Sequence, residues 1–249
     1  GECAAGESIC SEGVWSECLD QVLPQDEICD GLDNDCDGII DNPEVFYEKT
    51  DIVFVVDVSG SMCLYIEDLI VAISDYTFTL SGSDHKFAMI IHGYDSEGSY
   101  SVLSNLADIL TFVAAIMAQD CTDGSVEPTY DVIYDLAVPT NPLGMTWRSD
   151  ATPVIVVVQD ENPQTRRDIY PDDILPLTES CLLPGCDSIT NEYWTDGDPL
   201  EIFVITNPMY FPNYRMFVLG DGLRFFDINA SSSSISVGLD LIFREICVD

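Results

Sequence analysis

DIVFVVDVSGSM, residues 51–62, is the stretch that decides the fold, because an unbroken apolar run ends there in oxygen-bearing side chains. Residues 52–56 have the composition of a strand that is buried on both faces of a sheet. Asp57, Ser59 and Ser61 follow immediately. The stretch therefore predicts an internal strand whose tip delivers a carboxylate and two hydroxyls to one edge of the sheet.

Apolar strands alternate with helix-like segments from residue 50 onward, which predicts an α/β fold with a mostly parallel central sheet flanked by helices. Residues 161–199 contain several prolines and are expected to form a long loop with one short helix. The expected strands are 51–57, 86–92, 100–104, 153–159, 201–206 and 224–228, and the expected helices are 62–78, 105–118, 128–138 and 234–247.

Composition divides the 249 residues into two predicted domains. Residues 1–46 form a cysteine-rich module with few long apolar side chains, which needs disulfides or a metal to be stable. Residues 47–249 form the α/β domain. The chain starts at Gly1 rather than Met, so we expect that its natural N-terminus has been removed or that it is a piece of a longer protein.

The chain is strongly acidic, with 45 Asp and Glu against 8 Lys and Arg and a formal net charge of −37. Such a surface repels nucleic acid and anionic lipid, which excludes both as partners. No apolar run approaches the length of a membrane-spanning helix. The charge instead favours counter-ions or bound divalent cations.

Ten cysteines indicate an oxidising, extracellular compartment. Zinc is the competing interpretation, but the chain has no CxxC pair and only two histidines, His85 and His92. Short spacings make Cys29 with Cys36, and Cys181 with Cys186, the best candidates for local disulfides. The remaining pairing is not determined by the sequence.

Three segments carry oxygen ligands to the same predicted edge, because ligands of open α/β sheets gather at the carboxyl ends of strands. Asp57 and Asp160 each follow a strand, and Glu127 and Thr129 precede a helix. Oxygen ligands without thiolate or imidazole suit Mg²⁺, Ca²⁺ or Mn²⁺. Gly60 is expected to permit the tight turn that aims the serine hydroxyls inward.

DVSGS at 57–61 resembles the Asp-x-Ser-x-Ser motif of von Willebrand factor A domains, the metal-ion-dependent adhesion site. VEPTYDVIYD at 126–135 and VIVVVQDEN at 154–162 resemble the second and third loops of that site, and the resemblance covers about residues 50–248. It implies Mg²⁺, or Ca²⁺ or Mn²⁺, bound by Asp57, Ser59, Ser61, Glu127 and Asp160, with Thr129 as the alternative to Glu127.

Glu127 departs from the family pattern, in which most members have Thr at this position. Its charge would neutralise the ion further, so a partner's carboxylate would gain less from binding it. In the alternative interpretation Asp57 only caps a helix that starts near Met62, and the serines are turn residues.

DNDCDGIIDNPE, residues 33–44, has the spacing of a twelve-residue calcium loop with a glycine at position 6. Its carboxylates would repel one another by about 1–4 kcal/mol per pair without a cation. An acidic linker is the alternative. The predicted Ca²⁺ ligands are Asp33, Asp35, Asp37, the Ile39 carbonyl, Asp41 and Glu44.

The segment CAAGESICSEGVWSECLDQVLPQDEICDGLDNDCDGIIDN, residues 3–42, resembles the metal-binding repeat of secreted bacterial proteins of the MopE type. The resemblance implies cation binding, secretion and a prokaryotic source. Calcium fits these ligands better than copper, because the segment has no His or Met cluster.

The function favoured by these motifs is a secreted or cell-surface, metal-dependent adhesion or protein-binding module, not an enzyme. Its partner would present an Asp or Glu carboxylate. The alternative is a structural subunit of an extracellular filament, sheath or surface layer, stabilised by calcium and disulfides, that self-associates. A metallohydrolase ranks last, because no general base beyond the metal ligands is apparent. A P-loop is set aside because no lysine follows a glycine-rich turn, and a nucleophile elbow because Asp57 replaces its glycine before Ser59.

Overall fold

The computed structural model describes residues 4–11, 13–25, 36, 49–79, 84–107, 111–112, 114, 122, 124–138, 142–178, 200–215, 225–229, 238–239 and 242. The chain divides into two compact units. One consists of Gly1–Tyr47 and Arg244–Asp249, and the other is Glu48–Phe243. Each unit is considered by itself below.

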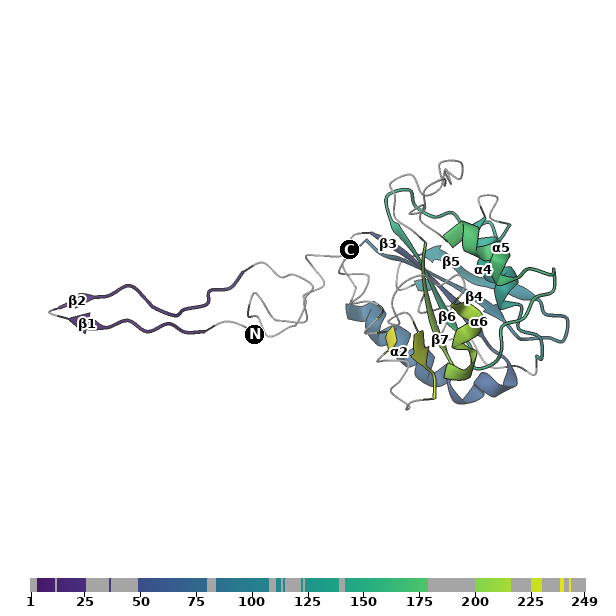
Figure 1. Cartoon of the computed structure of the whole chain (residues 1–249), viewed down its shortest axis with the longest axis horizontal. Helices are drawn as coiled ribbons and strands as arrows, with labels where there is room; N and C mark the ends of the chain where they lie inside the picture. Colours follow the sequence, from purple (N-terminus) through teal and green to yellow (C-terminus); the bar gives the residue numbers. More distant parts are fainter. Residues whose placement is uncertain are drawn as a thin grey trace. The chain divides into compact units, whose positions relative to one another are not determined.

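A six-stranded sheet forms the centre of the Glu48–Phe243 unit (Figure 1). Its strand order is β5-β4-β3-β6-β7-β8, and every neighbouring pair is parallel except β4 and β5. The predicted α/β fold with a mostly parallel sheet is therefore confirmed. The strands are β3 (Thr50–Asp57), β4 (Lys86–His92), β5 (Tyr100–Ala107), β6 (Thr152–Val158), β7 (Glu201–Thr206) and β8 (Phe225–Asp227).

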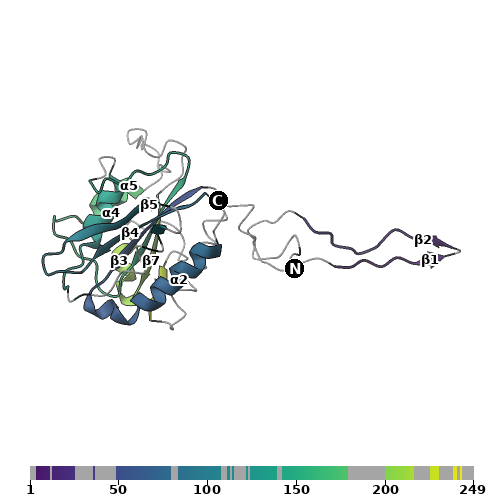
Figure 2. The same cartoon turned by 180° about the vertical axis from the view of Figure 1, so that it is seen from behind.

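Helices cover both faces of this sheet, with α4 and α5 on one face and α2 on the other (Figure 1); Figure 2 shows the same arrangement from behind. A short helix, α6, and a 3-10 turn, η2, follow β7. The helical elements are η1 (Gly60–Leu64), α2 (Ile66–Thr79), α4 (Thr129–Ala137), α5 (Pro171–Thr178), η2 (Pro208–Tyr210) and α6 (Phe211–Tyr214).

Two predicted helix starts are wrong. The segment after β3 begins with the 3-10 turn η1, and the α-helix starts only at Ile66. Residues 105–107 belong to β5 rather than to a helix, because β5 continues its antiparallel pairing until Ala107 meets Phe87. At residues 105–107, pairing with the buried strand β4 therefore outweighs the local preference for a helix.

Successive side chains of β3 pack into the core on opposite faces of the sheet. Val53 and Val55 of β3 join one buried cluster with Val132 and Ile133 of α4. Phe54 points to the other face, where its ring stacks on Phe112 at 5.7 Å. Because side chains alternate along a strand, Asp57 lies on the α4 face, two residues beyond Val55.

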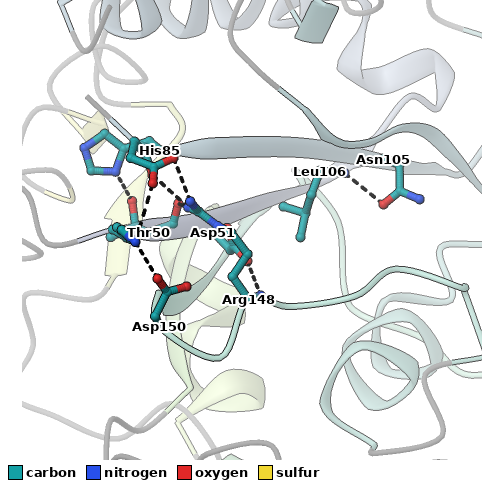
Figure 3. A network of polar contacts seen from close by, with 9 residues as sticks. Thr50, Asp51, His85, Asn105, Leu106, Arg148 and Asp150 are labelled. Carbon is teal, nitrogen blue, oxygen red and sulfur yellow. Dashed lines mark hydrogen bonds and ion pairs between the residues drawn. The ribbon is translucent and has the colours of Figure 1, made fainter. Parts of the chain in front are cut away.

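The amino ends of the central strands are held by a network around Arg148 (Figure 3). The Arg148 Nε and backbone N–H each donate to the buried carboxylate of Asp51 at 2.7 Å. The same guanidinium donates to the carboxylate of Asp84 at 2.9 Å and to the Thr50 carbonyl at 3.0 Å. Arg148 therefore ties the amino end of β3 to the segment that precedes β4.

The described part of the Gly1–Tyr47 unit is a two-stranded antiparallel ribbon with β1 (Cys10–Ser11) and β2 (Val14–Trp15). Isolated bridges from Glu7 to Leu19 and from Ala4 to Val22 extend it. Its apolar side chains are exposed, for example Trp15 at 68%. No described helix of either unit is both long enough and apolar enough to span a membrane.

Candidate metal centre

The candidate site lies where the strand order reverses. The chain proceeds from β3 outward to β4 and β5, then returns to β6 beside β3 and proceeds to β7 and β8 on the other side. The loops that follow β3 and β6 therefore diverge, and this is the position where open α/β sheets bind ligands. Asp57 ends β3, and Asp160 follows β6 by two residues.

Ser61 joins the loops that follow β3 and β6. Its Oγ donates to Oδ1 of Asp160 at 3.0 Å, and the hydroxyls of Ser59 and Ser61 hydrogen-bond over 3.0 Å. The Ser59 backbone N–H donates to Oδ1 of Asp57 at 2.8 Å, so the carboxylate folds back over its own loop. Four of the predicted ligands are thus contiguous.

Glu127 brings the third loop into the site. Its side chain is buried and its Oε2 accepts from the Gln164 amide at 2.7 Å. The negative charge of Glu127 helps to raise the pKa of Asp57, and the negative charge of Asp160 helps to raise the pKa of Glu127. The hydroxyl of Thr129, by contrast, donates to Oε1 of Gln159 and is fully buried. Of the two residues considered for the second loop, Glu127 interacts electrostatically with Asp57, whereas the Thr129 hydroxyl is hydrogen-bonded to Gln159.

Two glycines make the close approach of the loops possible. Gly93 follows β4 with φ +75°, and a Cβ there would stand 2.3 Å from Oδ1 of Asp57. A Cβ on Gly124 would stand 1.7 Å from the carbonyl oxygen of Gly93. Gly60, which we expected to make the tight turn, is not among the described glycines with positive φ. Of Gly60, Gly93 and Gly124, only Gly93 has the positive φ that favours glycine.

The buried carboxylates are electrostatically strained. Burial raises the pKa of Asp57 to about 7, aided by the nearby charges of Glu127 and Asp160. Burial, with the charges of Glu161 and Asp160, raises the pKa of Glu127 to about 7. Burial also raises the pKa of Asp160, although the Ser61 hydrogen bond opposes it. A cation would relieve all three.

The donor set fits a hard cation when the serine hydroxyls are included. Oδ2 of Asp57 is buried and has no hydrogen-bond partner among the described residues, so it is available for an ion or an ion-bound water. Ser61 is exposed, which leaves a solvent-facing side. Within the described residues, no three Asp, Glu, His or Cys side chains form a metal-holding group by themselves. Any cation here would therefore depend on Ser59 and Ser61.

The other predicted site residues fall elsewhere. The calcium-loop ligands Asp33, Asp35, Asp37, Ile39, Asp41 and Glu44 lie outside the described residues, as do Cys29, Cys181 and Cys186. Cys36, inside that loop, is described: it has φ 65° and is disulfide-bonded, as is Cys63. Cys10 and Cys18 are free and exposed.

Three residues of the site were not found by sequence reasoning: Gly93, Gln159 and Gln164. The first two directly follow strands, a position that could have identified them. Gln164 lies in the long loop after β6, and its amide contact with Glu127 had no local signal. No known family model matches the chain, and no curated protein is significantly similar to it.

Proposed function

We propose that the Glu48–Phe243 unit is a von Willebrand factor A-type domain that binds a divalent cation and uses it to hold a protein partner. The observation that carries this proposal is the convergence at one sheet edge of oxygens from separate segments, with Ser61 and Asp160 3.0 Å apart. The motif resemblance and the topological position of the site support it.

Ser59, Ser61 and Glu127 would hold the ion, and Asp57 and Asp160 would act directly or through water. Mg²⁺, Ca²⁺ or Mn²⁺ would supply an open coordination position for an Asp or Glu carboxylate of the partner. Gln164 orients Glu127 by donating to Oε2. The proposed role is secreted or cell-surface adhesion without catalysis, and residues 33–44 would bind a second cation, Ca²⁺.

Cation binding by the full chain tests this proposal. Titration with Mn²⁺, followed by electron paramagnetic resonance, would report a site that is lost in Ser61→Ala and retained in Ser101→Ala, an exposed serine of β5. Retained binding by native cell-surface material in Mg²⁺ and its loss in EDTA would support the adhesion role. Equal Mn²⁺ binding by both serine variants would contradict the site.

A structural subunit of an extracellular assembly is the second candidate function. The exposed apolar side chains of the ribbon, Ile9, Val14, Trp15 and Leu19, favour it, since such a surface is normally covered. Light scattering with and without EDTA separates the two functions. Cation-dependent polymers support the assembly, and a monomer in both conditions supports the adhesion module.

A further inference from the structure

A row of four polar side chains crosses the sheet through Asp57. His92, Asp57, Gln159 and Thr206 stand at the carboxyl ends of β4, β3, β6 and β7, which are consecutive neighbours in the sheet. Asp57 pairs with His92 in register, and Gln159 and Thr206 each come one residue after the paired Val158 and Ile205. All four residues of the row are 0% exposed.

The four side chains share one face of the sheet. Val55, Ile90, Val157 and Val204 each lie two residues before a member of the row, and all four belong to the core cluster that contains α4. Because side chains alternate, the row continues this face. Helices cover it: the hydroxyls of Thr129 in α4 and Tyr214 in α6 both donate to Oε1 of Gln159, the latter at 3.1 Å.

Five side-chain atoms of the row are buried without a hydrogen-bond partner among the described residues. They are Oδ2 of Asp57, Nδ1 and Nε2 of His92, Nε2 of Gln159 and Oγ1 of Thr206. Leaving a buried donor or acceptor unsatisfied is destabilising, and five unsatisfied atoms on one face would together offset a large fraction of a domain's stability.

The spacing and polarity of the row match bridging water. Neighbouring strands are about 4.8 Å apart, and one water that makes two hydrogen bonds of about 2.8 Å spans up to about 5.6 Å. The row also offers both donors and acceptors to water: Oδ2 of Asp57 accepts, Nε2 of Gln159 donates, and the Thr206 hydroxyl does both. A water between each pair of neighbours would have the two or more polar partners that buried waters need.

We propose that His92, Asp57, Gln159 and Thr206 form an internal hydration site, in which bound water molecules bridge neighbouring side chains across four strands. The water requires no cation, since its partners are all side chains of the protein. If the proposed function holds, the same water also hydrogen-bonds to Oδ2 of Asp57, a carboxylate that belongs to the cation site as well.

A high-resolution crystal structure of the full chain in EDTA tests the proposal without reference to the cation. We expect ordered water within hydrogen-bond distance of Asp57 Oδ2, Gln159 Nε2 and Thr206 Oγ1. A dry row, or side chains that bond to one another directly, would overturn it. Failure of cation binding would leave this measurement unchanged, so the two proposals fail separately.

A matched pair of variants tests the same site in solution. Thr206→Val removes the hydroxyl at nearly constant volume, whereas Thr206→Ser keeps it. Oxygen-17 magnetic relaxation dispersion, which counts long-lived internal water, should show a loss of bound water in the Val variant and none in the Ser variant. Equal water in both variants would contradict the proposal, and the wild-type crystal structure decides the matter if the Val variant does not fold.

Discussion

Oγ of Ser61 donates to Oδ1 of Asp160 at 3.0 Å, although 99 positions separate the two residues. The contact exists because β3 and β6 are neighbours in the sheet, so that the loops after them start side by side. It joins a hydroxyl from one loop to a carboxylate from another, and a cation between them would be shared by both. The following predictions depend on this juxtaposition or on the parts of the fold that create it.

Proton competition should make cation affinity depend on pH. Asp57 and Glu127 have pKa values of about 7, so below that pH a cation must displace protons to bind. Apparent Mg²⁺ affinity should therefore rise with pH and level off above about 7, by up to tenfold per pH unit for each proton displaced. Isothermal titration calorimetry in buffers of different ionisation enthalpy measures the released protons. Affinity that is constant from pH 5 to 8 would contradict the role of these carboxylates.

Asp57 should make the cation-free protein less stable as pH rises. Its pKa is 3.8 ordinarily and about 7 in the folded protein, so the folded state binds more protons than the unfolded chain between these values. Relative to Asp57→Asn, wild-type stability in EDTA should fall through this window. Urea unfolding at a series of pH values measures the difference. The buried histidines, whose pKa values are lowered, contribute the opposite trend to both proteins and cancel in the comparison.

Gly93→Ala should damage the site more than an equivalent change elsewhere. The new Cβ would meet Oδ1 of Asp57 at 2.3 Å, and alanine would have to adopt the left-handed backbone conformation of Gly93, whose φ is +75°. Gly144→Ala is the matched control, since its φ is +67° but nothing lies within 4 Å of the added Cβ. We expect about 1–2 kcal/mol of destabilisation in the control from backbone strain alone, and a larger loss with weakened cation binding in Gly93→Ala. Thermal unfolding with and without Mn²⁺ measures both.

Arg148→Met should unfold the domain at much lower denaturant. It leaves the carboxylate of Asp51 buried without its guanidinium, and breaking a buried pair from one side costs about 3–5 kcal/mol. Lys49→Met is the control, because the Lys49 side chain pairs with Asp150 on the exposed surface and should change stability little. Guanidinium-induced unfolding in EDTA compares them. Similar midpoints for the two variants would show that the ion pair between Arg148 and Asp51 is not a stability determinant.

Sequence reasoning succeeded where a signal is local. The apolar runs at β3 and β6 predict buried strands because short runs rich in β-branched residues are typical of a sheet covered on both faces. It failed at residues 105–107, where pairing with β4 extends a strand past the point at which the local pattern turns helical. It also did not single out Gly93, whose positive φ and close approach to Asp57 are set by the tertiary structure.

The sequence by itself determined the chemistry available to the candidate site: hard oxygen side chains placed just beyond apolar strands, in a strongly acidic chain. Only the tertiary structure decided which of these oxygens meet. It engages the hydroxyl of Thr129 with Gln159, brings Ser61 to Asp160, and aligns His92, Asp57, Gln159 and Thr206 in one buried row. The reason is that strand order and register set the distances between segments far apart in the chain, and no local pattern encodes them.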